Sequence, residues 1–286
     1  MALPMSGQLS AISRILAIFL VLTGYALGTL SRNIVWRSDL KLWMDSLNKS
    51  PRKARPYRIY ADSLKKANDL DRAIMYYRKA MQLDSQSPMT YNNLGVILED
   101  KGMLDQAASL YRQALSIWPD YPDALNNLGN ICLKQGRIDE AASFFRKAIK
   151  LKRDPDYYYN LGSTSQREEH WDEAITWITR ALALRDDLEY AHNNLGVSYW
   201  RKGLNEQALS EFKKAIVIKP DFFDAHANLG LLYYRVYKDN TQALFHLNYA
   251  LTIAPAHPQA GMIKGVVEEI QRKGQRVKGK GFKGQG

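Results

Sequence analysis

The sequence predicts an all-α chain of stacked helical hairpins, an α-solenoid. A leucine-glycine pair recurs at steps of 34, 33, 34 and 34 residues. A period in this range is typical of repeats that bury their apolar faces only by stacking on their neighbours. No stretch of any length alternates polar and apolar residues as a strand would. The recurring pairs are Leu94-Gly95, Leu128-Gly129, Leu161-Gly162, Leu195-Gly196 and Leu229-Gly230.

Each unit is expected to contain two helices. Around Gly95, apolar residues at spacings of three and four define the first helix, and Gly102 suits the tight turn that follows it. The second helix carries two alanines seven residues apart, which let the two backbones approach closely. These alanines are Ala73 and Ala80, Ala107 and Ala114, Ala141 and Ala148, Ala174 and Ala181, Ala208 and Ala215, and Ala243 and Ala250.

These phased positions resemble the tetratricopeptide repeat (TPR) over residues 54–257, in six units. The resemblance implies a right-handed superhelix of about six helix-turn-helix repeats. The first unit has Tyr60-Ala61 in place of leucine-glycine, and the sixth has one extra residue within residues 236–240. Residues 258–273 are expected to form a capping helix. Residues 274–286 are a basic, glycine-rich tail that we expect to be disordered.

A membrane anchor is predicted for residues 1–31. Residues 15–31 contain no charged side chain and are mostly apolar, which indicates one transmembrane helix. A signal peptide, with Ala26-Leu27-Gly28 as a small-x-small cleavage site, is the alternative. More basic residues follow the span than precede it, so the positive-inside rule would place the repeats in the cytoplasm.

Residues 32–53 are expected to form a basic linker and a half-repeat. The junction is similar to the stretch after the last membrane helix in TPR-containing O-mannosyltransferase-like membrane proteins. That resemblance implies extracytoplasmic (periplasmic) repeats, the side we expect for this single-pass membrane protein. The catalytic membrane part of that family has no counterpart here, so none of its catalytic residues can be transferred. The residues that carry the resemblance are Arg32-Asn33-x-x-Trp36, Leu42-Trp43, Ser50-Pro51 and Arg55-Pro56.

Charge and composition favour binding over catalysis. The net charge of +11 arises at the two ends, because residues 67–271 sum to −3, and this does not favour a nucleic-acid partner. Cys132 is the only cysteine. His192 and His226 share one repeat position with Tyr158, where packing is the expected role. No phosphate loop or metal-ligand spacing is present in the sequence, so we expect no enzyme activity, no cofactor and no metal.

A face of the first helices is the predicted peptide-binding surface. An asparagine stands two residues before each glycine, and in a stacked solenoid these residues line the concave side. Side-chain amides can donate to and accept from an extended backbone. The row resembles the asparagine ladder in the TPR superhelix of O-linked N-acetylglucosamine transferase; the alternative is that the asparagines orient neighbouring helices. The predicted amide contacts are Asn93, Asn127, Asn130, Asn160, Asn194 and Asn228.

Basic residues follow the ladder seven positions later. Lys134, Arg167, Arg201 and Arg235 would favour an acidic peptide, or would instead pair with acids such as Asp156 and Asp224. The sequence therefore predicts a membrane-anchored TPR scaffold or adaptor that binds an extended protein segment. The alternative is a substrate-recognition accessory of a membrane protein glycosyltransferase. The sequence leaves the oligomeric state open.

Overall fold

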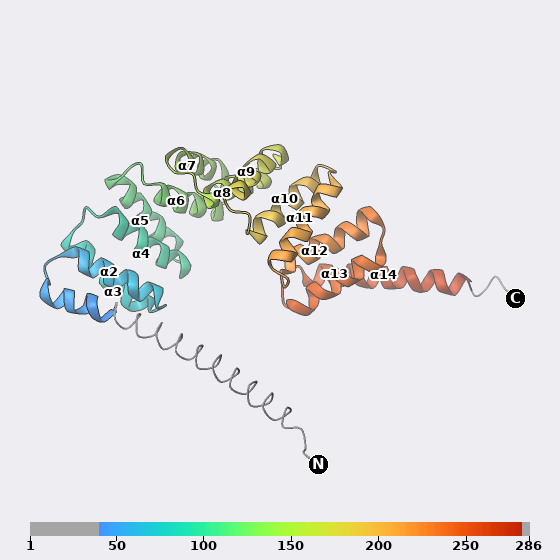
Figure 1. Ribbon diagram of the computed structural model, residues 1–286, viewed down its shortest axis with the longest axis horizontal. Coiled ribbons are helices and arrows are strands. Elements are labelled where there is room, and N and C mark those ends of the chain that lie inside the picture. The colour runs from blue at the N-terminus through green and yellow to red at the C-terminus, as the bar shows by residue number, and fades with distance from the viewer. Residues whose placement is uncertain (1–39, 282–286) are drawn as a thin grey trace, which may run out of the picture. The chain divides into compact units, whose positions relative to one another are not determined.

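The computed structural model describes residues 40–281, and helices account for most of them (Figure 1). No strand occurs between residues 40 and 281. The chain divides into two compact units, Met1–Pro119 and Asp120–Gly286. Six helical hairpins are present in the described residues, two in the first unit and four in the second. The all-α solenoid predicted from the repeat period is confirmed.

The first unit contains two hairpins after a short helix. In that short helix, residues 40–49, Leu47 is only 5% exposed. The second helix of each hairpin packs on the first, and the two hairpins also contact each other. The hairpins are formed by α2 (Ala54–Lys66) with α3 (Leu70–Leu83), and by α4 (Pro88–Asp100) with α5 (Leu104–Ile117).

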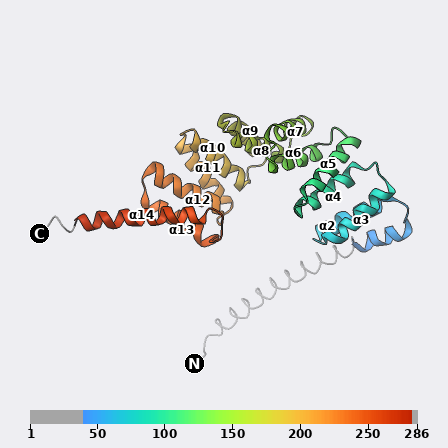
Figure 2. The same cartoon turned by 180° about the vertical axis from the view of Figure 1, so that it is seen from behind.

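The second unit contains four hairpins and a final helix. Its hairpins lie side by side in chain order, as Figure 1 and the reverse view in Figure 2 both show. The helices are α6 (Pro122–Lys134), α7 (Ile138–Leu151), α8 (Pro155–Arg167), α9 (Trp171–Leu184), α10 (Glu189–Arg201), α11 (Asn205–Ile218), α12 (Phe223–Leu232) with η1 (Tyr233–Tyr237), α13 (Asn240–Ile253) and α14 (Ala260–Gly281).

Local sequence explains where the helices begin and turn. Proline occupies the start of α4, α6 and α8, where its missing N–H leaves no hydrogen bond unmade. The residue seven positions after the Leu-Gly glycine turns the chain in a left-handed conformation. This residue is Gly203 in one hairpin, with φ +75°, whereas Glu169 adopts φ +59° at the same repeat position. A side chain at positive φ is strained, so Glu169 marks a turn in which geometry overrides residue preference.

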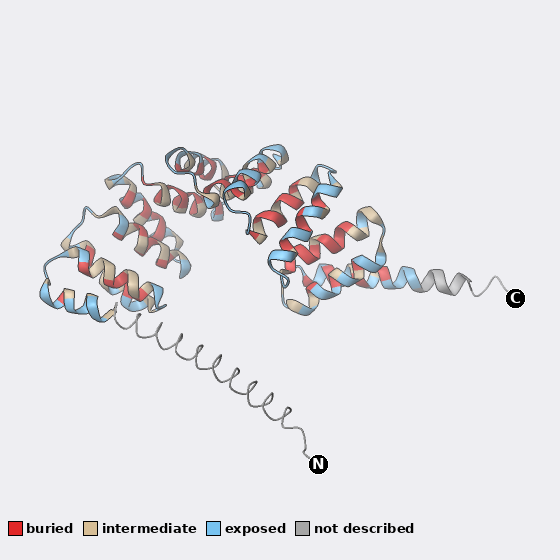
Figure 3. Cartoon of the chain, viewed as in Figure 1, coloured by how far each residue is buried: buried red, intermediate tan, exposed pale blue. Residues whose placement is uncertain are grey.

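The core of each hairpin depends on small residues. A Cβ atom built on Gly129 would lie 2.7 Å from Phe145 Cε1, so only glycine allows this approach. Ala141 and Ala148 on the opposing helix are both 0% exposed. Buried residues follow the faces along which the helices of each unit meet (Figure 3). The spacing of glycine and alanine in the sequence thus becomes close helix-helix packing.

Two local features of the second unit differ from an ordinary hairpin. The extra residue of the sixth repeat is accommodated by the π-helical turn η1 and by Lys238, which has φ 55°. The predicted capping helix is longer than expected, because α14 continues past Lys273 to Gly281. Apolar residues such as Ile263 and Val267 attach this helix to the preceding core.

The predicted anchor and most of the basic linker lie outside the described residues. This applies to residues 1–31 and to the Arg32-Asn33-x-x-Trp36 part of the junction. Among residues 40–281, none of the helices combines the length and the apolar character that a membrane span requires.

Candidate functional site

The predicted ligand residues are carried by the first helices of the hairpins. Asn93 belongs to the first unit, and the other nine belong to the second. The asparagines two places before the glycines are half-buried, because each stands beside the packed stripe of its helix. We call the side of α6, α8, α10 and α12 that carries Asn127, Asn160, Asn194 and Asn228 the asparagine face.

Side-chain hydrogen bonds connect successive first helices along the asparagine face. Asn160 donates from Nδ2 to Oδ1 of Asn126 at 2.9 Å, joining α8 to α6. Asn228 likewise donates to Oδ1 of Asn193 at 2.9 Å, joining α12 to α10. A carboxamide has two N–H groups and a carbonyl oxygen. Each bond therefore orients neighbouring helices, the alternative role for these asparagines, and leaves the other N–H and the oxygen of Asn160 and Asn228 for a ligand.

A tyrosine completes the link between α8 and α10. Asn194 donates from Nδ2 to the hydroxyl of Tyr159 at 2.9 Å. Burial, reinforced by the nearby Tyr190, raises the pKa of Tyr159 to about 12. The phenol therefore stays neutral at physiological pH and serves as a stable acceptor. The rings of Tyr159 and Tyr190 meet edge to face at 4.6 Å, which fixes the hydroxyl in place.

In the first unit the same position contacts a carboxylate. Asn93 donates to Oδ1 of Asp62 at 2.9 Å, joining α4 to α2. Asp62 also accepts from Arg58 at 3.0 Å and from the buried hydroxyl of Tyr77. Burial raises the pKa of Tyr77, so its hydroxyl remains a donor. Asp62 thus accepts hydrogen bonds from three side chains. The amide of Asn93 is therefore bonded to a carboxylate of the neighbouring helix and has a structural role.

The side chains of Arg167 and Arg201 contact groups other than carboxylates. Arg167 donates from Nη1 to the carbonyl oxygen of Leu133 at 3.0 Å. The guanidinium of Arg201 lies over the ring of Trp171, 5.7 Å from its centroid. Lys134 also has an interaction within the protein. These contacts hold the side chains without neutralising the charges of Arg167 and Arg201.

The two acids expected to neutralise these bases are engaged elsewhere. Asp156 pairs with Arg185 at 2.6 Å. Asp224 lies 3.8 Å from Nε2 of His257. The alternative that Asp156 and Asp224 would pair with Arg167 and Arg201 is therefore not what the structure shows. It failed because repeat phase predicts which helix a side chain is on but not the direction that a long side chain takes.

A hollow of about 440 Å³ opens at the C-terminal end of the asparagine face. It collects Arg201, Asn228 and Arg235, three of the predicted ligand residues, from α10, α12 and η1. The lining contains no carboxylate. Its remaining residues are Val197, Trp200, Leu231, Gln259 and Met262.

Several residues of this hollow carried no sequence signal for binding. Gln259 and Met262 lie at the start of the capping helix, for which only a packing role was expected. Met262 is 47% exposed although it lies beside a buried core. Trp200 precedes Arg201, and its ring packs edge to face with that of Phe212, so Trp200 lies between the core and the hollow. An aromatic residue directly before a predicted contact was the one available hint.

The first conspicuous histidine has a structural role. His192 Nδ1 lies 2.6 Å from Oε2 of Glu211, and Nε2 lies 2.9 Å from the carbonyl oxygen of Asp186. The ring is therefore held from both sides, by a carboxylate and by a backbone carbonyl oxygen. Burial acts to raise the pKa of Glu211, but hydrogen bonds from His192 and Lys214 outweigh it and lower that pKa.

In the next repeat, a second histidine takes the place of this carboxylate. His226 Nε2 contacts the carbonyl oxygen of Pro220 at 3.0 Å, and the Nδ1 atoms of His226 and His246 are 3.0 Å apart. Burial lowers the pKa of both rings, that of His246 to about 4. The predicted packing role of His192 and His226 agrees with these contacts. No cluster of three or more metal-ligating side chains exists among residues 40–281.

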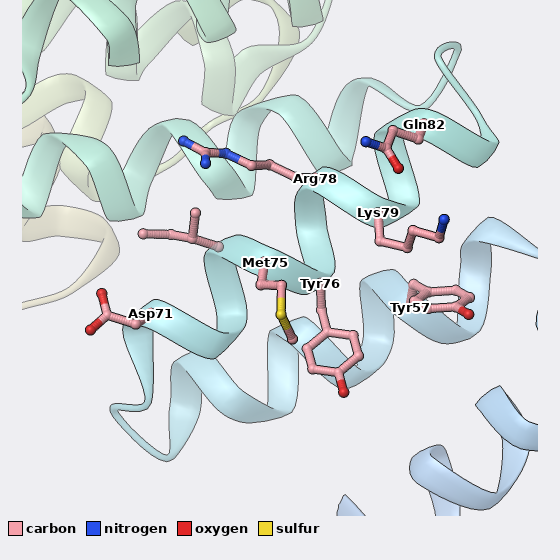
Figure 4. Close-up of a pocket in the computed structure, with 8 residues that line it drawn as sticks. Tyr57, Asp71, Met75, Tyr76, Arg78, Lys79 and Gln82 are labelled. Carbon is pink, nitrogen blue, oxygen red and sulfur yellow. The ribbon is translucent and has the colours of Figure 1, made fainter.

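A second hollow, of about 450 Å³, lies in the first unit on the outer side of α3 (Figure 4). Tyr57 comes from α2, and all other lining residues come from α3. Ile74, Met75, Tyr76 and Tyr57 form its apolar part, and Asp71 lies at the opposite end from Tyr57 (Figure 4). None of the predicted ligand residues lies there, and it gathers no set of convergent polar groups.

The stacked hairpins define this chain as a helical repeat protein of the α-solenoid class. Family models of the tetratricopeptide repeat match residues 54–87, 86–154, 158–189 and 201–236, which together exceed half of the chain. The chain belongs to the tetratricopeptide repeat proteins. No curated protein matches it.

Solved structures agree on the fold. A chain of the APC/C hetero-tetramer Cut9-Hcn1 aligns with TM-score 0.72 and 20% identity over 82% of this chain, which spans 46% of that longer chain. YrrB, described as a TPR protein with an unusual peptide-binding site, aligns with TM-score 0.53 and 26% identity, over 66% of this chain and 97% of its own. PilW, a type IV pilus biogenesis factor, aligns with TM-score 0.66 and 20% identity over 73% and 97%.

Proposed function

We propose that this chain is a TPR scaffold that binds an extended protein segment along the asparagine face of its second unit. The observation that carries the proposal is the hydrogen-bonded series of first helices from α6 to α12. In that series Asn160 and Asn228 each donate one N–H to the neighbouring helix and keep a carbonyl oxygen and a second N–H. Pre-oriented amides can bind a peptide backbone without reading its sequence.

Two further observations support a binding role. The charges of Arg167 and Arg201 are held in place without an acidic partner, so they remain available to an external group. YrrB, which is 26% identical, is described as having a peptide-binding site. Since no catalytic set is recognised in the sequence, we propose that the chain acts by holding other proteins and not by catalysis.

The test combines peptide binding with a matched control. Full-length protein in detergent is applied to an array of unstructured peptides of varied composition, and the tightest binders are titrated in solution. Asn160→Ala with Asn194→Ala should weaken binding at least roughly tenfold, since two polar contacts are lost. Asn248→Ala, an exposed asparagine of α13, should leave binding unchanged.

Folding must be measured alongside binding in that test. Each substituted asparagine also loses its bond to a neighbouring helix, at a cost of about 1 kcal/mol. Far-UV circular dichroism should show unchanged helicity at the assay temperature. If the wild type binds a peptide and the double variant binds it with the same affinity, the asparagine face is not the binding surface.

We also propose that residues 15–31 anchor the scaffold in a membrane with the repeats outside the cytoplasm. The uncharged apolar stretch supports an anchor, and the junction around Ser50-Pro51 and Arg55-Pro56 supports this side. Protease added to intact spheroplasts should digest the repeats. Full protection, with digestion only after lysis, would place them in the cytoplasm.

The junction also favours a second candidate function, that of a substrate-recognition accessory to a membrane protein glycosyltransferase. This candidate requires a separate catalytic subunit, because the resemblance does not extend to the catalytic membrane part. Deleting the chain should then reduce glycosylation of specific proteins while the transferase remains present. Unchanged glycosylation in the deletion strain would leave the scaffold proposal alone.

A further inference from the structure

The hollow at the end of the asparagine face combines positive charge with an apolar floor. Arg201 and Arg235 contribute the charge, and both side chains are exposed. Leu231 is 6% exposed, and Val197 lies half-buried beside it. A purely hydrophilic ligand would leave the apolar surface of this hollow in contact with water. A ligand that also has an apolar group would fit it better.

The two guanidinium groups lack the carboxylate partner that several arginines of the same unit have. Arg137, Arg146 and Arg185 each lie within salt-bridge distance of a carboxylate. Arg201 and Arg235 form no ion pair among residues 40–281, and no acid lines the hollow. Stacking on Trp171 positions Arg201 but leaves its N–H groups free to donate. Two uncompensated cations in one hollow complement an anionic partner.

Polar side chains between these features suit a peptide. Asn228 retains its carbonyl oxygen after donating to Asn193, and Gln259 is an exposed carboxamide at the other side of the hollow. Such amides can bind the N–H and C=O groups of an extended chain while its side chains reach the arginines and the floor. Isolated carboxylate or phosphate would use the arginines alone.

We propose that this hollow binds an acidic segment of a partner protein, in which carboxylates flank an apolar side chain. The carboxylates pair with Arg201 and Arg235, and the apolar side chain covers Leu231 and Met262. The inference rests on the proposed function and adds to it the chemistry of the bound segment. It also places the recognition of ligand side chains at one end of the asparagine face. The remaining asparagines of that face bind the backbone of the ligand.

The test uses defined probes with the full-length protein in detergent. The first probe is a fluorescent ten-residue peptide with two aspartates on either side of one leucine in a serine-glycine background. The second has asparagines in place of the aspartates, and the third has alanine in place of the leucine. We expect the first to bind at least roughly tenfold more tightly than the second, because charge-assisted hydrogen bonds are lost. Loss of the leucine should weaken binding severalfold.

Protein variants locate the effect. Arg201→Gln with Arg235→Gln should weaken the acidic probe at least roughly tenfold and leave the neutral probe unchanged. Arg112→Gln is the control, because it removes one positive charge at an exposed position of α5 in the first unit. It should not change the affinity for either probe. Raising salt should weaken the acidic probe more than the neutral one.

Other results would overturn the inference. Equal affinity for the acidic and neutral probes would do so, as would wild-type affinity in the double arginine variant. If a single-stranded oligonucleotide binds more tightly than the acidic probe, the two arginines would instead serve to bind nucleic acid. If the acidic and neutral probes bind equally and both are weakened by Asn160→Ala with Asn194→Ala, the proposed function stands while this inference falls.

Discussion

Replacing Gly162 by alanine tests the close approach on which every hairpin depends. A Cβ atom at this position would lie 2.6 Å from Ile178 Cγ1, 3.2 Å from Ile178 N and 3.3 Å from Ala174 O. Two of these atoms belong to the backbone of α9 and cannot rotate away, and Ile178 is fully buried. The overpacking should cost about 3 kcal/mol, the upper end for an added methyl group, against about 1 kcal/mol gained in helix propensity. The net loss should be about 2 kcal/mol.

Gly265→Ala is the matched control for this variant. Gly265 is also a helical glycine of the second unit, in α14, but no atom lies within 4 Å of the place that a Cβ atom would occupy. It should gain up to about 1 kcal/mol from propensity alone. Urea titration monitored by far-UV circular dichroism gives the midpoint of unfolding for both variants. Comparing midpoints does not require a two-state fit, which a repeat protein need not obey. Equal midpoints for the two variants, or a stabilised Gly162→Ala, would refute the packing argument.

Packing, turn geometry and charge each give one further prediction. Ala141→Leu should cost about 1–3 kcal/mol by overpacking, and an unchanged melting temperature would count against it. Glu169→Gly should raise the free energy of unfolding by up to about 1 kcal/mol, and with it the urea midpoint, because φ is +59°. Gly203→Ala, at φ +75°, should lower the free energy of unfolding by about 1 kcal/mol. Burial, with the charges of His226 and Lys213, lowers the pKa of His246 from 6.5 to about 4. Because the unfolded ring binds a proton before the folded one, stability should fall between pH 6.5 and 4 by on the order of 1–2 kcal/mol, allowing for solvent screening, and His246→Leu should flatten that slope.

The repeat period was sufficient to predict the hairpins because a local rule repeats along the chain. Each Leu-Gly glycine faces a large side chain four residues after the first alanine of the next helix, as Gly129 faces Phe145, so spacing alone locates the contact. The rule weakens where geometry has more freedom. The extra residue near Val236 was placed correctly, but its form, the π-helical turn of η1, depends on tertiary packing. The end of α14 was placed too early because glycines after Lys273 disfavour a helix without excluding it.

The candidate site was less predictable because the repeat position of a long side chain does not determine which group it contacts. The sequence located the asparagines on one face, and their bonds to neighbouring helices follow from that position. It could not tell that Arg167 would turn to a backbone carbonyl oxygen or Arg201 to Trp171. It also provided no reason to expect Gln259 and Met262, from the capping helix, in the same hollow as Arg201. Contacts between elements distant in sequence require the folded arrangement.

One repeat position in the second unit shows how a fixed backbone can carry different chemistry. Tyr158 stacks on Trp177 at 6.0 Å, His192 contacts the buried carboxylate of Glu211, and the equivalent His226 contacts a second histidine. The backbone partner of each histidine is the same, a carbonyl oxygen six residues earlier. The two hairpins with histidine at this position are those whose first helices, α10 and α12, also line the hollow. Since arginine keeps its charge at every relevant pH, acid should act on the hollow through the stability of these hairpins and not through its guanidinium groups.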